Sequence, residues 1–309
     1  MDQTLAPITA PIPVRASSTD DPAELLRFAI DAHRRGAVAL ATLVEIRGGA
    51  ARALGAHMAV AADGRFCGYV SGGCVEAAVA SEALLAMAEG RDRTVKFGDG
   101  SPFFDIVLPC GGGITVAIHV LKDVGALQHV LDRLGQRQAA GLVYSPERQT
   151  LISVGPPLRT CWTEGDFLTV YRPRTRVVLS GQTLEAQAVA RLAEASGYDV
   201  IVRGRGEEAR VAADIIDPFT AVVLLHHDLD AEAAILETAL HSPGFYIGAL
   251  GSTRTHHRRA ERLTALGFRR DDIGRIKAPI GMFGPTRDAT SLALSVLADI
   301  AAARLVAYA

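Results

Sequence analysis

The stretch VVLSGQTLEAQAVARLAEASGYDVIV, residues 177–202, decides the fold class of this chain. Its apolar start predicts a strand, the Ala- and Leu-rich middle predicts a helix, and the apolar end predicts a second strand. The alternation continues with strands at 221–225 and 245–249 and helices at 230–240, 254–266 and 291–304. Strands that alternate with helices form βαβ units. The sequence therefore predicts an α/β protein whose residues 175–309 form a doubly wound parallel sheet.

The residues before this region predict a different kind of domain. Helical spacing occurs at 21–35 and 74–89, and strands are expected at 38–46, 57–61, 66–70, 94–97, 105–108 and 114–121. A further helix and a hairpin near Trp162 complete a mixed α+β domain over residues 20–170. The basic segment YRPRTR, residues 171–176, is the expected connector. The proline-interrupted residues 1–21 are expected to form a flexible leader.

Composition narrows the class of protein. The chain has 309 residues, of which 49% are hydrophobic and 21% charged, and its net charge is -2. No basic tract is present, so nucleic acid is an unsuitable partner. No uninterrupted apolar run reaches about 18 residues, which argues against a membrane span. Four cysteines are too few for a disulfide scaffold, so we expect a cytoplasmic protein in which Cys67 and Cys161 are structural.

The motif SGGCVE, residues 71–76, is the first candidate site. Gly72 and Gly73 allow a ligand to approach the backbone closely, and Cys74 is expected in the first turn of a helix. The helix dipole and unpaired N–H groups favour an anion there, either a thiolate or a phosphate. Glu76 is either a general base or a favourable first-turn acid. A plain strand-to-helix turn with a small buried cysteine explains the motif equally well.

The motif PCGGG, residues 109–113, is the second candidate site. One or two glycines are enough for a turn, and here Gly111, Gly112 and Gly113 follow Cys110. The pattern favours a soft thiolate beside backbone amides that face a bulky ligand, and Cys110 as the ligand of a metal. The alternative is a loose glycine turn with a buried thiol.

The turn after the strand at 177–180 resembles a damaged dinucleotide fingerprint. The second glycine of that fingerprint lets the pyrophosphate approach the backbone, and Thr183 occupies its position after Gly181. The next strand is followed by Arg203 rather than by an acidic residue that would bind ribose hydroxyls. Both features argue against NAD, whereas an arginine is compatible with the 2′-phosphate of NADP.

Two later glycine loops also precede helices. The loop with Gly248, Gly251, Ser252 and Arg254 offers amides, hydroxyls and a guanidinium to a phosphate, or it is an ordinary helix cap. The loop with Gly281 lies in residues 279–287. In a doubly wound sheet such loops gather at the carboxyl ends of the strands, where ligands bind.

The histidine pairs at 226–227 and 256–257 do not form a convincing metal site. Adjacent residues point to different faces of an element, so neither pair grips one ion. We expect surface or loop histidines. The motifs HExxH, CxxC and GxSxG do not occur in the sequence.

Taken together, the motifs resemble those of the XdhC/CoxI family, the accessory proteins of xanthine and carbon monoxide dehydrogenases. The segments at 71–76, 109–112, 246–252 and 278–281 have the family's order and spacing, and the resemblance covers residues 24–304. It implies an N-terminal XdhC/CoxI-like domain and a C-terminal Rossmann-like domain.

The resemblance also implies a function. Such proteins bind the molybdenum cofactor (molybdopterin), protect it, help a cysteine desulfurase or sulfurtransferase to sulfurate it, and pass it to an apo-molybdoenzyme of the xanthine dehydrogenase family. The chain would then be an accessory protein rather than an enzyme. By this resemblance Cys110 is the first candidate for the molybdenum-site thiolate, Cys74 and Glu76 are second, and the glycine loops hold the pterin phosphate.

Two other functions compete with this one. A NAD(P)-dependent oxidoreductase would use the Rossmann-like domain, against the evidence of Thr183 and Arg203. A scaffold protein would have purely structural cysteines. The general prevalence of symmetric dimers makes a homodimer the default assembly.

Overall fold

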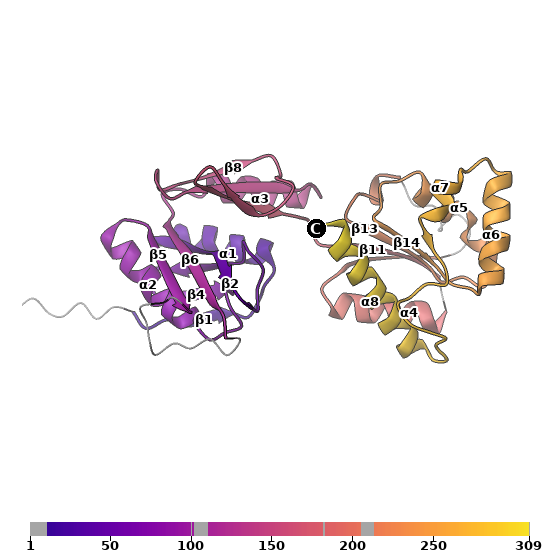
Figure 1. The fold of residues 1–309 in the computed structure, drawn as a ribbon, viewed down its shortest axis with the longest axis horizontal. Helices are drawn as coiled ribbons and strands as arrows, with labels where there is room; N and C mark the ends of the chain where they lie inside the picture. The colour runs from indigo at the N-terminus through magenta and orange to yellow at the C-terminus, as the bar shows by residue number, and fades with distance from the viewer. Residues whose placement is uncertain (1–10, 100, 102–110, 182, 205–212, 309) are drawn as a thin grey trace, which may run out of the picture. The chain divides into compact units, whose positions relative to one another are not determined.

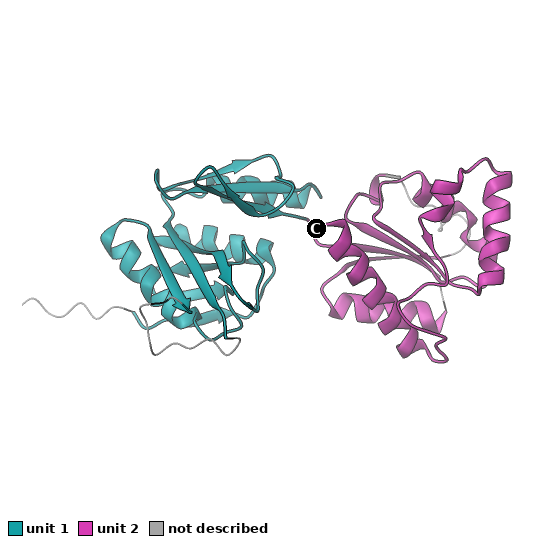
Figure 2. Cartoon of the chain, in the orientation of Figure 1, with its two compact units in different colours: residues 1–172 teal, residues 173–309 magenta. Residues whose placement is uncertain are grey.

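The computed structural model of the chain describes residues 11–99, 101, 111–181, 183–204 and 213–308. The chain divides into two compact units, Met1–Arg172 and Pro173–Ala309 (Figure 2). The division falls inside the basic connector at residues 171–176.

A six-stranded sheet forms the centre of the N-terminal unit (Figure 1). Its order is β1-β4-β3-β2-β6-β5, with β2 paired antiparallel to both β3 and β6. Alternate residues of β2 point to opposite faces, so Leu43 lies on one face and Leu40 on the other, and both are buried. The strands are β1 (Val14–Ser17), β2 (Val38–Arg47), β3 (His57–Ala61), β4 (Arg65–Gly68), β5 (Arg93–Gly98) and β6 (Gly113–Val120).

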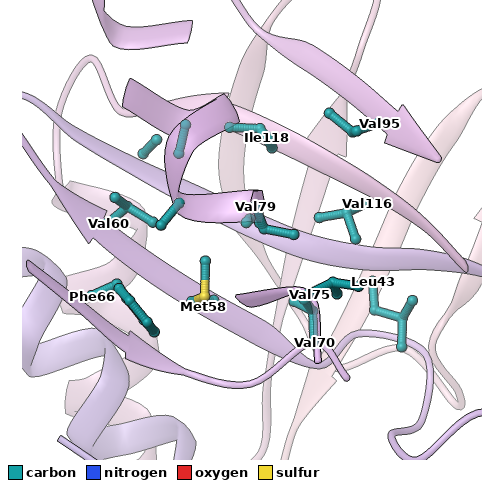
Figure 3. Packing of buried hydrophobic residues seen from close by; sticks show 14 of the residues in the cluster. Leu43, Met58, Val60, Phe66, Val70, Val75, Val79, Val95, Val116 and Ile118 are labelled. Atoms are coloured by element: carbon teal, nitrogen blue, oxygen red, sulfur yellow. The ribbon is translucent and has the colours of Figure 1, made fainter. Parts of the chain in front are cut away.

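Helix α2 (Glu76–Glu89) covers one face of this sheet. Figure 3 shows Val79 of the helix among side chains of the central strands, including Leu43, Met58 and Val116. The helix ends at Gly90, which adopts the left-handed conformation with φ 66° that glycine accepts without steric cost. The close packing fixes the start of α2, and therefore the turn before it, on the sheet.

The other face of the sheet is covered by a second layer. It contains α1 (Pro22–His33), α3 (Gly125–Gly135) and a four-stranded sheet of order β8-β7-β10-β9. The strands are β7 (Ala140–Ser145), β8 (Thr150–Val154), β9 (Cys161–Thr163) and β10 (Asp166–Tyr171). The indole N–H of Trp162 donates to the carbonyl of Val44 at 2.9 Å and so ties the second sheet to β2. The sequence predicted only a hairpin in this region.

Two expectations for this unit are wrong. Residues 14–17, expected in a flexible leader, form β1 and pair in parallel with β4. Four exposed or half-buried residues carry too little apolar periodicity to announce a strand. Helix α2 begins at Glu76, so Cys74 precedes the helix instead of lying in its first turn. The strand expected at 105–108 lies outside the described residues.

The C-terminal unit is a five-stranded parallel sheet of order β12-β11-β13-β14-β15. Helices α4 and α8 pack on one face, and α5, α6 and α7 pack on the other. This confirms the predicted Rossmann-like architecture. The elements are β11 (Arg176–Ser180), α4 (Leu184–Ala195), β12 (Asp199–Arg203), η2 (Ala213–Ile215), β13 (Thr220–Leu224), α5 (Leu229–Leu240), β14 (Tyr246–Ala249), α6 (Thr253–Ala265), α7 (Arg270–Gly274), β15 (Ile276–Lys277) and α8 (Ala289–Ala307).

Helix α8 is long and apolar enough to cross a membrane by length and composition alone. Its side chains Leu292, Val296 and Ile300 instead lie in the core with α4 and the sheet. One face of α8 therefore belongs to the core of this unit, while Leu294, Leu305 and Val306 are exposed.

Truncation of the central strand should destabilise the N-terminal unit. Leu43→Ala removes a fully buried side chain from both the sheet and α2, which typically costs about 2–5 kcal/mol. Leu85→Ala on the exposed side of α2 should change the free energy of unfolding by less than about 1 kcal/mol. Chemical denaturation followed by the fluorescence of Trp162, the single tryptophan, measures both. Equal effects of the two substitutions would contradict the packing.

Candidate functional site

A buried carboxylate closes the turn before α2. Glu76 is 1% exposed, and its oxygens accept hydrogen bonds from the Ser71 N–H and hydroxyl at 2.9 Å and from the Val75 N–H at 3.3 Å. The first N–H groups of a helix have no partner within the helix, and an acidic side chain there satisfies them and favours the dipole. The geometry is that of a first-turn acid that shapes the turn.

Cys74 lies at the outer side of this turn. It is exposed, its thiol is free, and its Sγ is 3.5 Å from the Ser71 hydroxyl. Gly73 adopts φ 110°, a conformation that favours glycine, and a side chain there would meet no atom within 4 Å. The turn therefore presents an accessible thiol beside open space, unlike a small buried cysteine.

The second glycine motif packs against the loop after β2. A Cβ atom on Gly112 would lie 2.4 Å from the carbonyl oxygen of Gly49, and one on Gly113 would lie 2.5 Å from that of Asp99. Close approach of the chain to itself accounts for both glycines. Gly111 is exposed with φ 67° and open space around it, and Cys110 lies outside the described residues.

The same loop, residues 48–52, also contacts the first motif. A Cβ atom on Gly72 would lie 3.3 Å from the Cβ of Ala51, and the Arg52 Nε lies 3.4 Å from the Ser71 carbonyl oxygen. The loop therefore bridges the two glycine motifs, which are almost 40 residues apart in sequence. No motif in the sequence marks this role of the loop, because it depends on contacts between distant segments.

A cavity of about 170 Å³ lies beside this bridge, within the N-terminal unit. In its lining, the His57 Nδ1 is 2.9 Å from the Thr42 hydroxyl, and the His57 Nε2 is hydrogen-bonded to the Tyr171 hydroxyl. Burial lowers the pKa of His57 from 6.5 to about 4, so the imidazole is neutral at pH 7. The lining residues are Asp20, Pro22, Leu25, Arg52, Gly55, Ala56, His57, Tyr69, Thr169, Val170 and Tyr171.

The carboxyl ends of the parallel strands gather the loops of the C-terminal unit at one edge, as predicted. After β11, Gly181 adopts φ 150°, and a Cβ there would lie 2.9 Å from the Leu225 carbonyl oxygen. The Thr183 hydroxyl caps α4 by accepting from the Ala186 N–H at 3.4 Å. The side chain that replaces the second glycine thus fills a place where a pyrophosphate would meet the helix.

His226 corrects an expectation. Of the predicted alternatives, a surface or a loop histidine, it is a loop residue, yet it is buried at 5% exposure and its Nε2 lies 2.7 Å from the Ser180 hydroxyl. Ser180 ends β11 and His226 follows β13, so this hydrogen bond spans the point where the strand order reverses. The sequence showed two adjacent histidines but not that the first one points inward.

The loop after β14 is fixed by contacts with buried residues of neighbouring elements. Gly248 is buried, and a Cβ there would lie 2.6 Å from Ile280, so this glycine serves packing. Arg259 of α6 pairs with Glu232 of α5 and donates to the Leu250 carbonyl at 2.9 Å. Both charged side chains are at most 2% exposed. Burial raises the pKa of the Glu232 carboxyl, while the neighbouring guanidinium of Arg259 opposes that change.

Other predicted residues of this loop lie at its surface. The Ser252 hydroxyl caps α6 by accepting from the Thr255 N–H at 3.3 Å, and Arg254 is exposed. Gly251 has φ 128°, which requires glycine. The Ser252 cap is the ordinary alternative that the sequence left open, and it leaves the other first-turn N–H groups of α6 for a ligand.

The loop with Gly281 is fastened to α8. A Cβ on Gly281 would lie 2.5 Å from the Ser295 hydroxyl, and the Gly281 N–H donates to the Asp299 carboxylate at 3.3 Å. Ser295 also accepts from the Phe283 N–H at 2.9 Å. Within the described part of the chain, no three His, Cys, Asp or Glu residues are grouped to hold a metal ion.

Fold and site together define a two-unit protein with an accessible thiol turn on an α+β unit and a Rossmann-like second unit. Residues 32–98 match the family described as "XdhC and CoxI family", and residues 177–300 match the "XdhC Rossmann domain". The chain is 51% identical over 295 residues to the "Molybdenum cofactor insertion chaperone PaoD" of Escherichia coli (strain K12). That similarity spans 95% of this chain and 92% of the relative. The chain belongs to the XdhC/CoxI family, as its motifs predicted.

Two further proteins are similar. The chain is 25% identical over 283 residues to the "Uncharacterized protein YqeB" of Escherichia coli, covering 85% of this chain and 42% of that protein. The crystal structure of a xanthine dehydrogenase from Bacillus halodurans gives a TM-score of 0.70 at 21% identity, over 93% of this chain and 96% of that one. This last similarity is one of fold alone.

Loss of the Glu76 carboxylate should open the thiol turn. Glu76→Ala leaves the Ser71 N–H and hydroxyl and the Val75 N–H without their acceptor, at about 1–3 kcal/mol for each group that stays buried. We expect lower stability and a changed rate of Cys74 alkylation, measured by mass spectrometry. Glu76→Gln keeps one acceptor oxygen and should lie between wild type and Glu76→Ala. Glu89→Ala at the exposed end of α2 is the control, and an effect as large as that of Glu76→Ala would contradict this role.

The neutral state of His57 should make stability depend on pH. Between pH 6.5 and about 4 the unfolded chain binds a proton at His57 that the folded chain does not, so stability falls as the pH falls through this window. The loss is about 3 kcal/mol by pH 4, and it should be smaller in His57→Gln. Denaturation at several pH values measures the difference between the two proteins. A constant difference would contradict a buried neutral imidazole.

Proposed function

We propose that this chain binds the molybdenum cofactor, protects it and inserts it into an apo-molybdoenzyme of the xanthine dehydrogenase family. The observation that carries the proposal is the exposed Cys74 thiol on the turn closed by Glu76. It occurs in a chain that is 51% identical, over nearly its whole length, to a molybdenum cofactor insertion chaperone. The chain acts as a carrier of this cargo rather than as an enzyme.

In the N-terminal unit, the residues present suit such a cargo. A thiolate is a soft ligand, and Cys74 is accessible to one. The backbone at Gly72, Gly73 and Gly111 is exposed, so a bulky ligand can approach it closely. Cys110 adjoins Gly111 in sequence, and we assign it the role of the thiolate at molybdenum, with Cys74 second. Gly112 and Gly113 support this face by their close packing on the loop at 48–52.

In the C-terminal unit, we propose that the glycine loops hold the phosphate of the pterin. The first-turn N–H groups of α6, next to Gly251 and Ser252, and the exposed guanidinium of Arg254 have the chemistry that an anion requires. Gly281 lies in the neighbouring loop, whose Ile280 N–H donates to the Ala249 carbonyl at 3.1 Å. Gly248 contributes through the packing of β14 beneath these loops.

The handover requires partners. We propose a cysteine desulfurase or sulfurtransferase that supplies the terminal sulfur, and an apo-molybdoenzyme that receives the cofactor. Both are cytoplasmic, as we propose for this chain, and a homodimer is the proposed assembly. The NAD(P)-dependent oxidoreductase is disfavoured because the Thr183 hydroxyl caps α4 in the turn where the pyrophosphate would approach.

Cofactor retention tests the proposal. The protein is purified from cells that make the molybdenum cofactor, and molybdenum and pterin fluorescence per chain are measured. We expect wild type to retain cofactor, Cys110→Ala to retain at least about tenfold less, and Cys74→Ala to show a smaller loss. Tenfold corresponds to about 1.4 kcal/mol of binding free energy.

Cys161→Ala is the matched control. This cysteine lies on β9, and its thiol lies 3.7 Å from the Arg159 carbonyl and from the Thr163 hydroxyl. It should retain cofactor like wild type. Absence of cofactor from every protein, together with binding of NAD(P)H, would overturn the proposal and favour the oxidoreductase. Retention unchanged in Cys110→Ala and Cys74→Ala would favour structural cysteines.

A further inference from the structure

The cavity beside Arg52 and Tyr69 has features of a binding site that the motifs do not include. Its walls come from four separate segments of the N-terminal unit: the start of α1 with the residues before it, the loop that leads into β3, the residue after β4, and β10. The volume of about 170 Å³ is below the roughly 300–1,000 Å³ of pockets that enclose a whole drug-sized ligand. One bicyclic ring fits such a space, whereas a complete cofactor does not.

The wall at the mouth suits a flat ring. The guanidinium carbon of Arg52 lies 5.0 Å from the centre of the Tyr69 ring, and Arg52 also forms an ion pair of 2.8 Å with Asp20. Planar guanidinium and phenol groups stack on heteroaromatic rings. The carboxylate and the guanidinium, side by side, accept from amino and N–H groups and donate to a carbonyl group. This pattern complements the edge of a 2-amino-4-oxo ring.

The floor is held in one arrangement. The Tyr171 hydroxyl and the His57 Nε2 are hydrogen-bonded to each other, and both residues line the cavity. His57 is fixed in turn by the Thr42 hydroxyl. Thr169, which is 5% exposed, adds a hydroxyl to the lining. These groups keep their positions without a ligand, so little conformational freedom is lost on binding.

Arg52 connects the cavity with the thiol turn. Its Nε lies 3.4 Å from the Ser71 carbonyl oxygen, and Tyr69 precedes Ser71 by two residues. A ligand whose ring fills the cavity therefore has its other end at the turn that carries Cys74. We propose that this cavity takes the pterin ring of the cofactor, so that the sulfur-bearing and metal-bearing end lies at the turn. This inference rests on the proposed function.

Binding of free pterin (2-amino-4-oxopteridine) to the full chain tests the assignment, with titration followed by pterin fluorescence. We expect Arg52→Met and Tyr69→Ala to weaken pterin binding at least about tenfold and to lower cofactor retention. Arg15→Met is the matched control, because Arg15 also lies over Tyr69, at 4.1 Å, but does not line the cavity. It should bind pterin within about threefold of wild type. The unfolding transition of each variant shows whether it is folded.

The outcomes separate the two proposals. If wild type carries the cofactor but binds no pterin, or if Arg52→Met and Tyr69→Ala both retain cofactor like Arg15→Met, the cavity assignment is wrong and the proposed function stands. If guanosine, which has the same amino-oxo edge, binds in place of pterin, the cavity belongs to a nucleotide base and the assignment is also wrong. If wild type carries no cofactor, the proposed function fails, whatever the titration shows.

Discussion

The organisation of the N-terminal unit depends on the central strand β2, which has a paired strand on each edge and a hydrophobic core on each face. Its backbone pairs with β3 and with β6, and its alternate side chains fill two separate cores. The carbonyl of Val44 also receives the indole N–H that docks the second sheet. A strand with so many simultaneous constraints has a single register, because a slip of one residue would exchange its two faces. The loop at 48–52 continues from the end of this strand.

That loop lies against described glycines of both motifs. The loop touches Gly72 on one side and Gly112 on the other. Residue 112 has to be glycine because the Gly49 carbonyl approaches it closely. A large part of this glycine motif therefore serves the contact between two backbone segments. The C-terminal unit repeats this pattern, since Gly181 and Gly248 also pack against the chain itself. Gly73 and Gly111 are different, because no other atom of the described residues lies within 4 Å of the place where a Cβ would be. Packing of the chain against itself does not account for these two glycines.

The sequence predicted the architecture because periodicity reports burial. Apolar runs such as the one in β11 and the strand–helix alternation were sufficient for the parallel sheet. The second sheet of the N-terminal unit was underpredicted, because its strands are short and half-buried on the β8 and β9 side. The inward direction of His226 and the cavity at Tyr171 depend on contacts between distant segments. No local sequence pattern contains that information. Helix α2 begins at Glu76, two residues later than expected, and the Glu76 carboxylate accepts a hydrogen bond from the Ser71 N–H before it.

A carrier has to hold its cargo and also release it, and the proposed arrangement meets both needs. In that proposal the cavity and the thiol turn are two separate contacts, connected through Arg52. Two contacts on one rigid ligand reinforce each other, because the first raises the effective concentration of the second. Cys74 is exposed, so on this proposal an acceptor protein reaches the metal end while the ring is still bound. On the same proposal, release proceeds one contact at a time.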